Sequence, residues 1–266
     1  MKVTKSQDPE LEQPFISHLV ELRNRLLRVV LCVLLVFIGL SFYANDIYGY
    51  ISEPLMRFLP ENNSMIAIDV VSPFLIPFKL ALVAAIFLSM PIILYQFWAF
   101  VAPGLYQHER RLIFPLLIAS NLLFYLGSAF AYFVVFPLVF EFLSMTVPAG
   151  VEVMTDIAKY QDFVLTLFLA FGLSFQVPIV TIVLVWTGLT TPKSLSEKRP
   201  YVIVGAFILG MFLTPPDAIS QTLLAIPIWL LFEAGLLFSR PFAKKASDAE
   251  AATENLIQIP PEEKDD

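Results

Sequence analysis

Six long apolar stretches constrain this chain more than any other feature. They lie near Leu26–Ala44, Phe74–Phe97, Leu112–Val135, Phe163–Trp186, Tyr201–Leu213 and Ile219–Phe238. A helix needs about 20 apolar residues to cross the roughly 30 Å of hydrocarbon in a bilayer, and a spanning helix satisfies its own backbone hydrogen bonds. The composition agrees, with 58% hydrophobic and 15% charged residues. We therefore predict an all-α polytopic membrane protein with six transmembrane helices.

The basic residues lie almost entirely in alternate connections between these stretches. Of the 17 Lys and Arg residues, only Arg57 and Lys159 fall in the opposite set of connections, and Lys79 lies within the second stretch. Cytoplasmic segments carry an excess of Lys and Arg. Both termini are therefore expected in the cytoplasm.

The fifth apolar stretch is shorter than a bilayer requires. Tyr201–Leu213 spans 13 residues, or about 20 Å of helix at 1.5 Å per residue. Pro215 and Pro216 follow it and cannot continue a helix. We expect the fifth and sixth helices to form a stunted hairpin that either thins the bilayer locally or leaves polar groups within it. Thr214, Ser220 and Gln221 would then lie unusually deep.

The chain divides into a long apolar part and a short acidic end. We predict one six-helix transmembrane domain over residues 1–242 and a disordered cytoplasmic tail over residues 243–266, because seven acids follow Arg240. Ser52–Pro60, with Pro54 in its first turn, is expected to form a short outer helix. Phe136–Met145 is expected to prolong the third span.

The sequence lacks the residues of the common catalytic and metal sites. It contains one cysteine, Cys32, and two histidines, His18 and His108. That set is too small for a typical zinc site, and neither a phosphate-binding loop nor a serine-nucleophile turn is present. We expect no metal, no cofactor, no enzymatic activity and no nucleic-acid partner.

Two carboxylates stand out in the predicted cytoplasmic segments. Glu21 lies in "FISHLVELRNRLLRVV", an amphipathic helix whose apolar positions Phe15, Leu19, Leu22 and Leu26 follow 3–4 spacing. It has Arg25 four residues on, and Glu109 is followed by Arg110 and Arg111. Local ion pairing is one explanation, and for exposed pairs it contributes less than about 1 kcal/mol.

Several motifs together carry a family resemblance. They are "FISHLVELRNRLL", "FYANDIY", "PGLYQHERR", "AFAYFVVFPL", "KRPYVIVGAFILGMFLTPPDAISQTLLAIP" and "LFE", in that order. From about Phe15 to Phe242 the chain resembles the TatC family, the large polytopic subunit of the twin-arginine protein translocase. The resemblance implies a concave, glove-like bundle of six helices in a bacterial inner membrane. It implies binding of twin-arginine signal peptides on folded cargo and proton-motive-force-driven export. It also implies assembly with single-span TatA-type and TatB-type subunits, and self-association in a multi-copy complex within the lipid bilayer.

The resemblance also assigns roles to individual residues. Glu21 and Glu109 match the signal-binding carboxylates, and a charge-assisted hydrogen bond to a guanidinium contributes roughly 1.5–3 kcal/mol. The residues expected to support these acids are Arg23, His108, Arg110 and Arg111. Pro54 matches a family position in the first outer loop and is expected to shape that loop. The positions where the family docks its small subunits are matched by Met211, Thr214 and Gln221.

One position departs from the family pattern. Gln176 stands where the family commonly has glutamate, so proton exchange at this position is not expected. Glu233 and Lys79 are expected near opposite interfaces, where their side chains reach water.

Two other functions stay open on the sequence alone. A secondary transporter for a small solute would suit six spans with kinking prolines, but such carriers usually place an acid at mid-membrane. The best acids of this chain lie in cytoplasmic segments instead. A purely structural scaffold would show no effect of Glu21 or Glu109 on cargo recognition.

Overall fold

The structure, a computed structural model, describes residues 9–50, 66–101, 113–145, 156–213 and 218–257. Within these residues the chain is helical, and its only β pairing is an isolated parallel bridge between Ile66 and Asp156. The helices form two compact units, which are described separately. The first unit comprises residues 1–121 and 153–161, and the second comprises residues 122–152 and 162–266.

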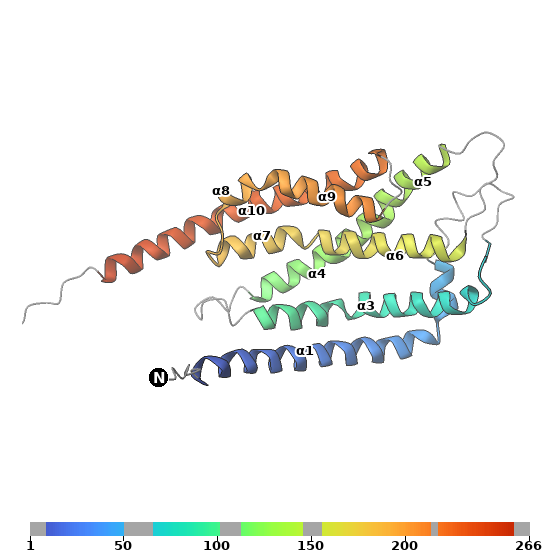
Figure 1. The fold of residues 1–266 in the computed structure, drawn as a ribbon, viewed down its shortest axis with the longest axis horizontal. Coiled ribbons are helices and arrows are strands. Elements are labelled where there is room, and N and C mark those ends of the chain that lie inside the picture. The colour runs from blue at the N-terminus through green and yellow to red at the C-terminus, as the bar shows by residue number, and fades with distance from the viewer. Residues whose placement is uncertain (1–8, 51–65, 102–112, 146–155, 214–217, 258–266) are drawn as a thin grey trace, which may run out of the picture. The chain divides into compact units, whose positions relative to one another are not determined.

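In the first unit, α1 (Pro9–Ser41) packs beside α3 (Ser72–Val101), as Figure 1 shows. The buried side chains of α3 include Leu80, Ala85 and Trp98. Trp98 Nε1 donates a hydrogen bond of 3.0 Å to Ser120 Oγ on α4 (Ile113–Phe130). Buried polar groups in an apolar region need such partners, so this bond fixes the end of α3 to α4.

In the second unit, α10 (Ala218–Ile257) packs against α7 (Val177–Trp186) and α9 (Arg199–Leu213). Figure 1 shows α10 lying beside both helices. A six-residue helix, α8 (Pro192–Glu197), connects α7 to α9 and is capped by the Thr191 hydroxyl, which accepts from the Ser194 amide. The glycine at position 235 permits the close approach of α10 to α7, since a Cβ at Gly235 would lie 2.7 Å from Pro178 Cα.

The predicted spans are largely confirmed. Five described segments are long and apolar enough to cross a membrane, namely Ser17–Ser41, Ser72–Val101, Phe114–Phe142, Ile157–Trp186 and Gln221–Pro241. The short fifth span is also confirmed, because α9 has 15 residues. The expected shortness of the sixth helix is wrong: α10 has 40 residues, and its apolar part alone has 21.

Two of the spans contain irregularities that hydropathy does not predict. The third passes from α4 through a π-helical turn at Ala131–Val135 into α5 (Phe136–Met145), as expected for a prolonged third span. The fourth is broken between α6 (Ile157–Ser174) and α7, where Pro178 lies in the first turn of α7. Proline lacks an amide hydrogen and is tolerated at a helix start, which explains a new helix at this point.

The tail differs from its prediction. Residues 243–257, which we expected to be disordered, continue α10 as helix to Ile257. The stretch "AKKASDAEAATENL" is rich in alanine, lysine and glutamate, which are strong helix formers. Residues 258–266 lie outside the described residues, and a domain boundary at residue 242 stays a prediction.

The orientation of α1 about its axis was not evident from its pattern. The leucines of the 3–4 stripe point outward, with Leu19 47% and Leu26 59% exposed. Less exposed positions are Glu21, Arg25 and Val29, which lie on the other face of α1. Exposed leucines suit a helix surrounded by lipid, so the polar face of α1 is turned toward the rest of its own unit.

Candidate functional site

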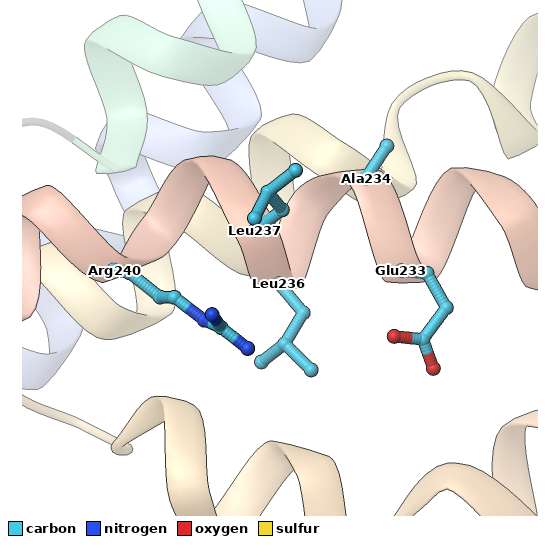
Figure 2. A pocket seen from close by; sticks show the side chains of 5 residues that line it. All are labelled: Glu233, Ala234, Leu236, Leu237 and Arg240. Atoms are coloured by element: carbon cyan, nitrogen blue, oxygen red, sulfur yellow. The ribbon is translucent and has the colours of Figure 1, made fainter.

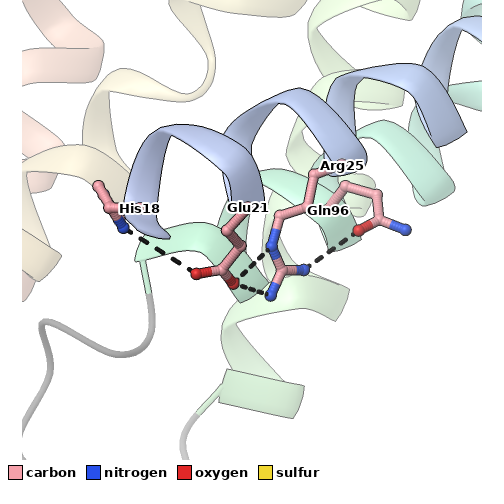
Figure 3. A network of polar contacts seen from close by, with 4 residues as sticks. All are labelled: His18, Glu21, Arg25 and Gln96. Carbon is pink, nitrogen blue, oxygen red and sulfur yellow. Dashed lines mark hydrogen bonds and ion pairs between the residues drawn. The ribbon is translucent and has the colours of Figure 1, made fainter. Parts of the chain in front are cut away.

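A polar network joins α1 to α3 at the end of the unit where α1 begins (Figure 3). Arg25 Nε and Nη2 both donate to Glu21 Oε1, at 2.9 and 2.6 Å. Arg25 Nη1 donates to Gln96 Oε1 at 3.1 Å. The other carboxylate oxygen, Glu21 Oε2, lies 4.0 Å from His18 Nδ1. The guanidinium of Arg25 is therefore held from two helices, and it uses only one of the two oxygens of Glu21.

A pocket of about 320 Å³ opens beside this network. Its lining comes from one face of α1, and the residues are Ser17, Val20, Glu21, Asn24, Arg25 and Arg28. The side chain of Glu21 is 36% exposed, whereas that of Arg25 is 20% exposed. The carboxylate is thus the more accessible member of the pair, and a cationic ligand in the pocket can reach it.

The last turn of α3 is fixed against α1 next to the same network. The His18 ring stacks on Phe100 with centroids 4.3 Å apart and an interplanar angle of 19°. Phe100 is followed by residues 102–112, which carry Glu109 and lie outside the described residues. The end of α3 is thus in contact with His18, which lies three residues before Glu21 on α1.

Several predicted site residues fall outside the described part of the chain. They are Pro54, His108, Glu109, Arg110, Arg111 and Thr214. Arg23, which is described, donates from Nε and Nη2 to Asn24 Oδ1 at 3.3 and 3.2 Å. It is exposed on α1 and makes no described contact with Glu21. A supporting role for Arg23 stays a prediction.

The predicted docking residues lie where α9 and α10 approach each other. Met211, in the last turn of α9, is 51% exposed. Gln221, in the first turn of α10, is half-buried. A Cβ at Gly210 would lie 3.4 Å from the backbone oxygen of Gln221, so the end of α9 and the start of α10 are in close contact. Met211 thus follows directly after Gly210, which is in contact with Gln221.

Gln176 occupies the break in the fourth span. It is the N-cap residue of α7 and is half-buried, with φ −79° and ψ −17°, and its side chain makes no capping bond to that helix. Within the described residues, no group of three or more His, Cys, Asp and Glu side chains could hold a metal ion.

A second ion pair, which the sequence did not predict, joins α9 to α10. Arg199 Nε donates to Glu233 Oε1 at 2.6 Å, and Arg199 Nη2 donates to Glu233 Oε2 at 2.8 Å. This is the bidentate arrangement that a guanidinium and a carboxylate prefer. Glu233 is therefore bound to Arg199, and its expected position near an interface stays a prediction. No local pattern indicates the pair, because the two residues are 34 positions apart.

Comparison with known families gives one consistent result. Residues 17–227 match the family model described as Sec-independent protein translocase protein (TatC). The chain is 59% identical over 243 residues to the Sec-independent protein translocase protein TatC of Haemophilus influenzae, covering 91% of this chain and 94% of that protein. It is 57% identical over 238 residues to the protein of that name from Escherichia coli K12, covering 90% of this chain and 92% of that protein.

Solved structures agree with the sequence relatives. The fold superimposes on a crystal structure of the twin-arginine translocase receptor TatC with a TM-score of 0.76 and 37% sequence identity, covering 85% of this chain and 99% of that chain. A second crystal structure, of the same receptor in DDM, gives a TM-score of 0.77 and 38% identity.

Proposed function

The chain belongs to the TatC family of Sec-independent protein translocase proteins, and from that premise we propose that it is the receptor that binds twin-arginine signal peptides through Glu21 and Glu109. As a member of this family it is a multi-pass membrane component of a protein translocase, and a transport protein rather than an enzyme. The identity of the bound motif, the residues that bind it and the partner subunits are the subject of the proposal.

The geometry of Glu21 carries the signal-peptide proposal. Arg25 donates twice to Oε1, and the one described group near Oε2 is His18 at 4.0 Å. Oε2 therefore keeps lone pairs available, and Glu21 lines an open pocket. An arriving guanidinium can bond to this oxygen without displacing Arg25, because a carboxylate accepts several hydrogen bonds at once.

Two adjacent arginines need two acceptors. Glu109 supplies the second, and the stacking of Phe100 on His18 supports its approach to Glu21, since the segment that carries Glu109 begins one residue after α3 ends. Arginine presents a planar fork to each acid, whereas lysine has no such fork. A twin-lysine peptide is therefore expected to bind more weakly.

The decisive experiment removes each carboxylate charge while keeping its shape. We expect Glu21→Gln and Glu109→Gln each to lower cross-linking of a twin-arginine signal peptide by ten- to hundredfold, because each loses a charge-assisted hydrogen bond of roughly 1.5–3 kcal/mol. The measurement is photo-cross-linking in membranes that contain the full chain and its partner subunits.

Glu197→Gln is the matched control. Glu197 is exposed on α8, in a connection that we predict to be cytoplasmic; it does not line the pocket, and the substitution makes the same charge change. It should leave cross-linking unchanged. Undiminished cross-linking after both Glu21 and Glu109 are replaced would exclude the proposed receptor role and favour a structural scaffold.

Recruitment of the small single-span subunits is proposed for the hairpin of α9 and α10. Exposed Met211 and half-buried Gln221 offer an apolar and a polar contact on adjoining turns. Polar groups at membrane depth hydrogen-bond across helices, so a polar residue of a partner helix suits this position. Assembly with TatA-type and TatB-type subunits, in several copies and in a bacterial inner membrane with both termini cytoplasmic, completes the proposal. Proton-motive force would drive the export.

Removing the polar groups tests this recruitment. We expect Thr214→Val combined with Gln221→Leu to reduce co-purification of the small subunits severalfold while signal-peptide cross-linking persists. Thr222→Val is the control, because the hydroxyl of Thr222 already donates to Ala218 O at 2.6 Å within α10. Equal recovery of the subunits from the double variant would contradict the docking proposal.

A further inference from the structure

A second pocket lies on α10, and its lining residues belong to the second unit (Figure 2). It has a volume of about 270 Å³ and is lined by Glu233, Ala234, Leu236, Leu237 and Arg240. Figure 2 shows Glu233, Leu236 and Arg240 directed to the same side of α10. These residues are three, four and seven positions apart, which is the spacing of one helix face. The pocket thus has a charged group at each end and a leucine between them.

The charges at the two ends are not equivalent. Glu233 is neutralised by the bidentate bond from Arg199, at 2.6 and 2.8 Å. Arg240, in contrast, has no hydrogen-bond or ion-pair partner among the described residues, and it is exposed. One positive charge therefore remains at this pocket, and its guanidinium is available to an anion.

The position of Arg240 along the helix identifies the kind of anion. The apolar segment of α10 ends at Pro241, so Arg240 lies in its last turn, where the hydrocarbon meets the headgroups. Leu237, which lines the same pocket, is 58% exposed. An amphipathic ligand with a phosphate at Arg240 and an acyl chain against Leu237 satisfies both features, and a guanidinium binds phosphate bidentately.

We propose that this pocket binds the headgroup of an anionic phospholipid of the phosphatidylglycerol type. The phosphate accepts from the Arg240 guanidinium, and Leu236 forms the apolar floor, since it is 2% exposed. Basic pockets between membrane helices are known to bind anionic headgroups. Lipid binding here is independent of signal-peptide binding at Glu21.

Native mass spectrometry of the purified full chain tests the proposal. The detergent solution would contain equal amounts of phosphatidylglycerol and phosphatidylcholine, and the measured quantity is the ratio of the two retained lipids. We expect the wild-type chain to retain phosphatidylglycerol preferentially. Arg240→Gln should lower the ratio by about fivefold or more, because it removes one cation that faces the anionic headgroup. Arg240→Lys, which keeps the charge but not the fork, should lower it less.

Three further arms make the result decisive. Lys193→Gln on α8 makes the same charge change on an exposed residue in the preceding connection, and it should alter the ratio less than twofold. An excess of inorganic phosphate should not displace the lipid, because free phosphate lacks the acyl chains. The melting temperature of Arg240→Gln should match the wild type, which excludes a folding defect. Equal retention of both lipids by the wild-type chain, or equal effects of Arg240→Gln and Lys193→Gln, would overturn the proposal.

Discussion

The helices α1 and α10 each carry a glutamate bound to an arginine, but the two pairs are built differently. On α1, Arg25 comes from the same helix, four residues after Glu21, and donates twice to one oxygen. On α10, Glu233 receives Arg199 from a different helix, and each of its oxygens accepts one bond. The glutamates are similarly accessible, at 36% and 26% exposure. The arrangement of the bonds therefore distinguishes the two pairs more than burial does.

This difference in bonding indicates that Glu21 is a binding group and that Glu233 is a structural one. The pair on α1 can change partners without moving a helix, because both residues belong to α1 and Glu21 lines a pocket. The pair on α10 joins two helices, so a change of partner would remove a bond between α9 and α10. The packing around the two helices follows the same division. Gly39 on α1 has no atom within 4 Å of a Cβ built on it, whereas Gly235 on α10 has a backbone atom at 2.7 Å.

The largest expected difference comes from adding one methyl group to each helix. Gly235→Ala should lower stability by about 1–3 kcal/mol, because its Cβ would overlap Pro178 Cα at 2.7 Å and crowd Thr181. Gly39→Ala should leave stability unchanged or raise it by up to about 1 kcal/mol, since alanine favours helix and the site is open. Thermal unfolding of the purified variants in detergent measures both. Equal melting temperatures for the two variants would contradict the view that α10 is the more tightly packed helix.

The next largest effect is expected for the pair between α9 and α10. Arg199→Gln or Glu233→Gln alone should lower the melting temperature by a few degrees, because each leaves its partner without its bidentate counter-charge. The double variant Arg199→Glu with Glu233→Arg should recover part of the loss, since it restores an ion pair in the opposite direction. If the melting temperature of the double variant is no higher than that of the less stable single variant, the pair does not hold the two helices together.

The smallest effect is expected for Arg25→Gln on α1. Pairs four residues apart on one helix contribute about 0.3–0.5 kcal/mol, and Glu21 is open to water when Arg25 is lost. The melting temperature should therefore shift less than it does for Arg199→Gln. Gln96→Leu, which removes the contact from α3, provides a second measurement of the same network. A larger drop in melting temperature for Arg25→Gln than for Arg199→Gln would reverse the assignment of structural and binding roles.

The sequence by itself determined the features that depend on short windows of the chain. Hydropathy located five long spans and the short α9 because each is a local property of about 20 residues. It also predicted the amphipathic start of α1, and the position of Glu21 within it, from 3–4 spacing. The expectation of a disordered tail was wrong for a local reason as well, because acidity was weighed above the helix propensity of its alanines and glutamates.

Only the tertiary structure decided which faces meet and which charges pair. The leucines of the 3–4 stripe on α1 are exposed, whereas Glu21 and Arg25 are less exposed and Arg25 contacts Gln96 of α3. In a membrane protein the lipid is as apolar as the interior, so hydrophobicity does not tell an outward face from a buried one. The bond between Arg199 and Glu233 was likewise invisible, because it depends on how α9 and α10 lie against each other and not on any spacing within either helix.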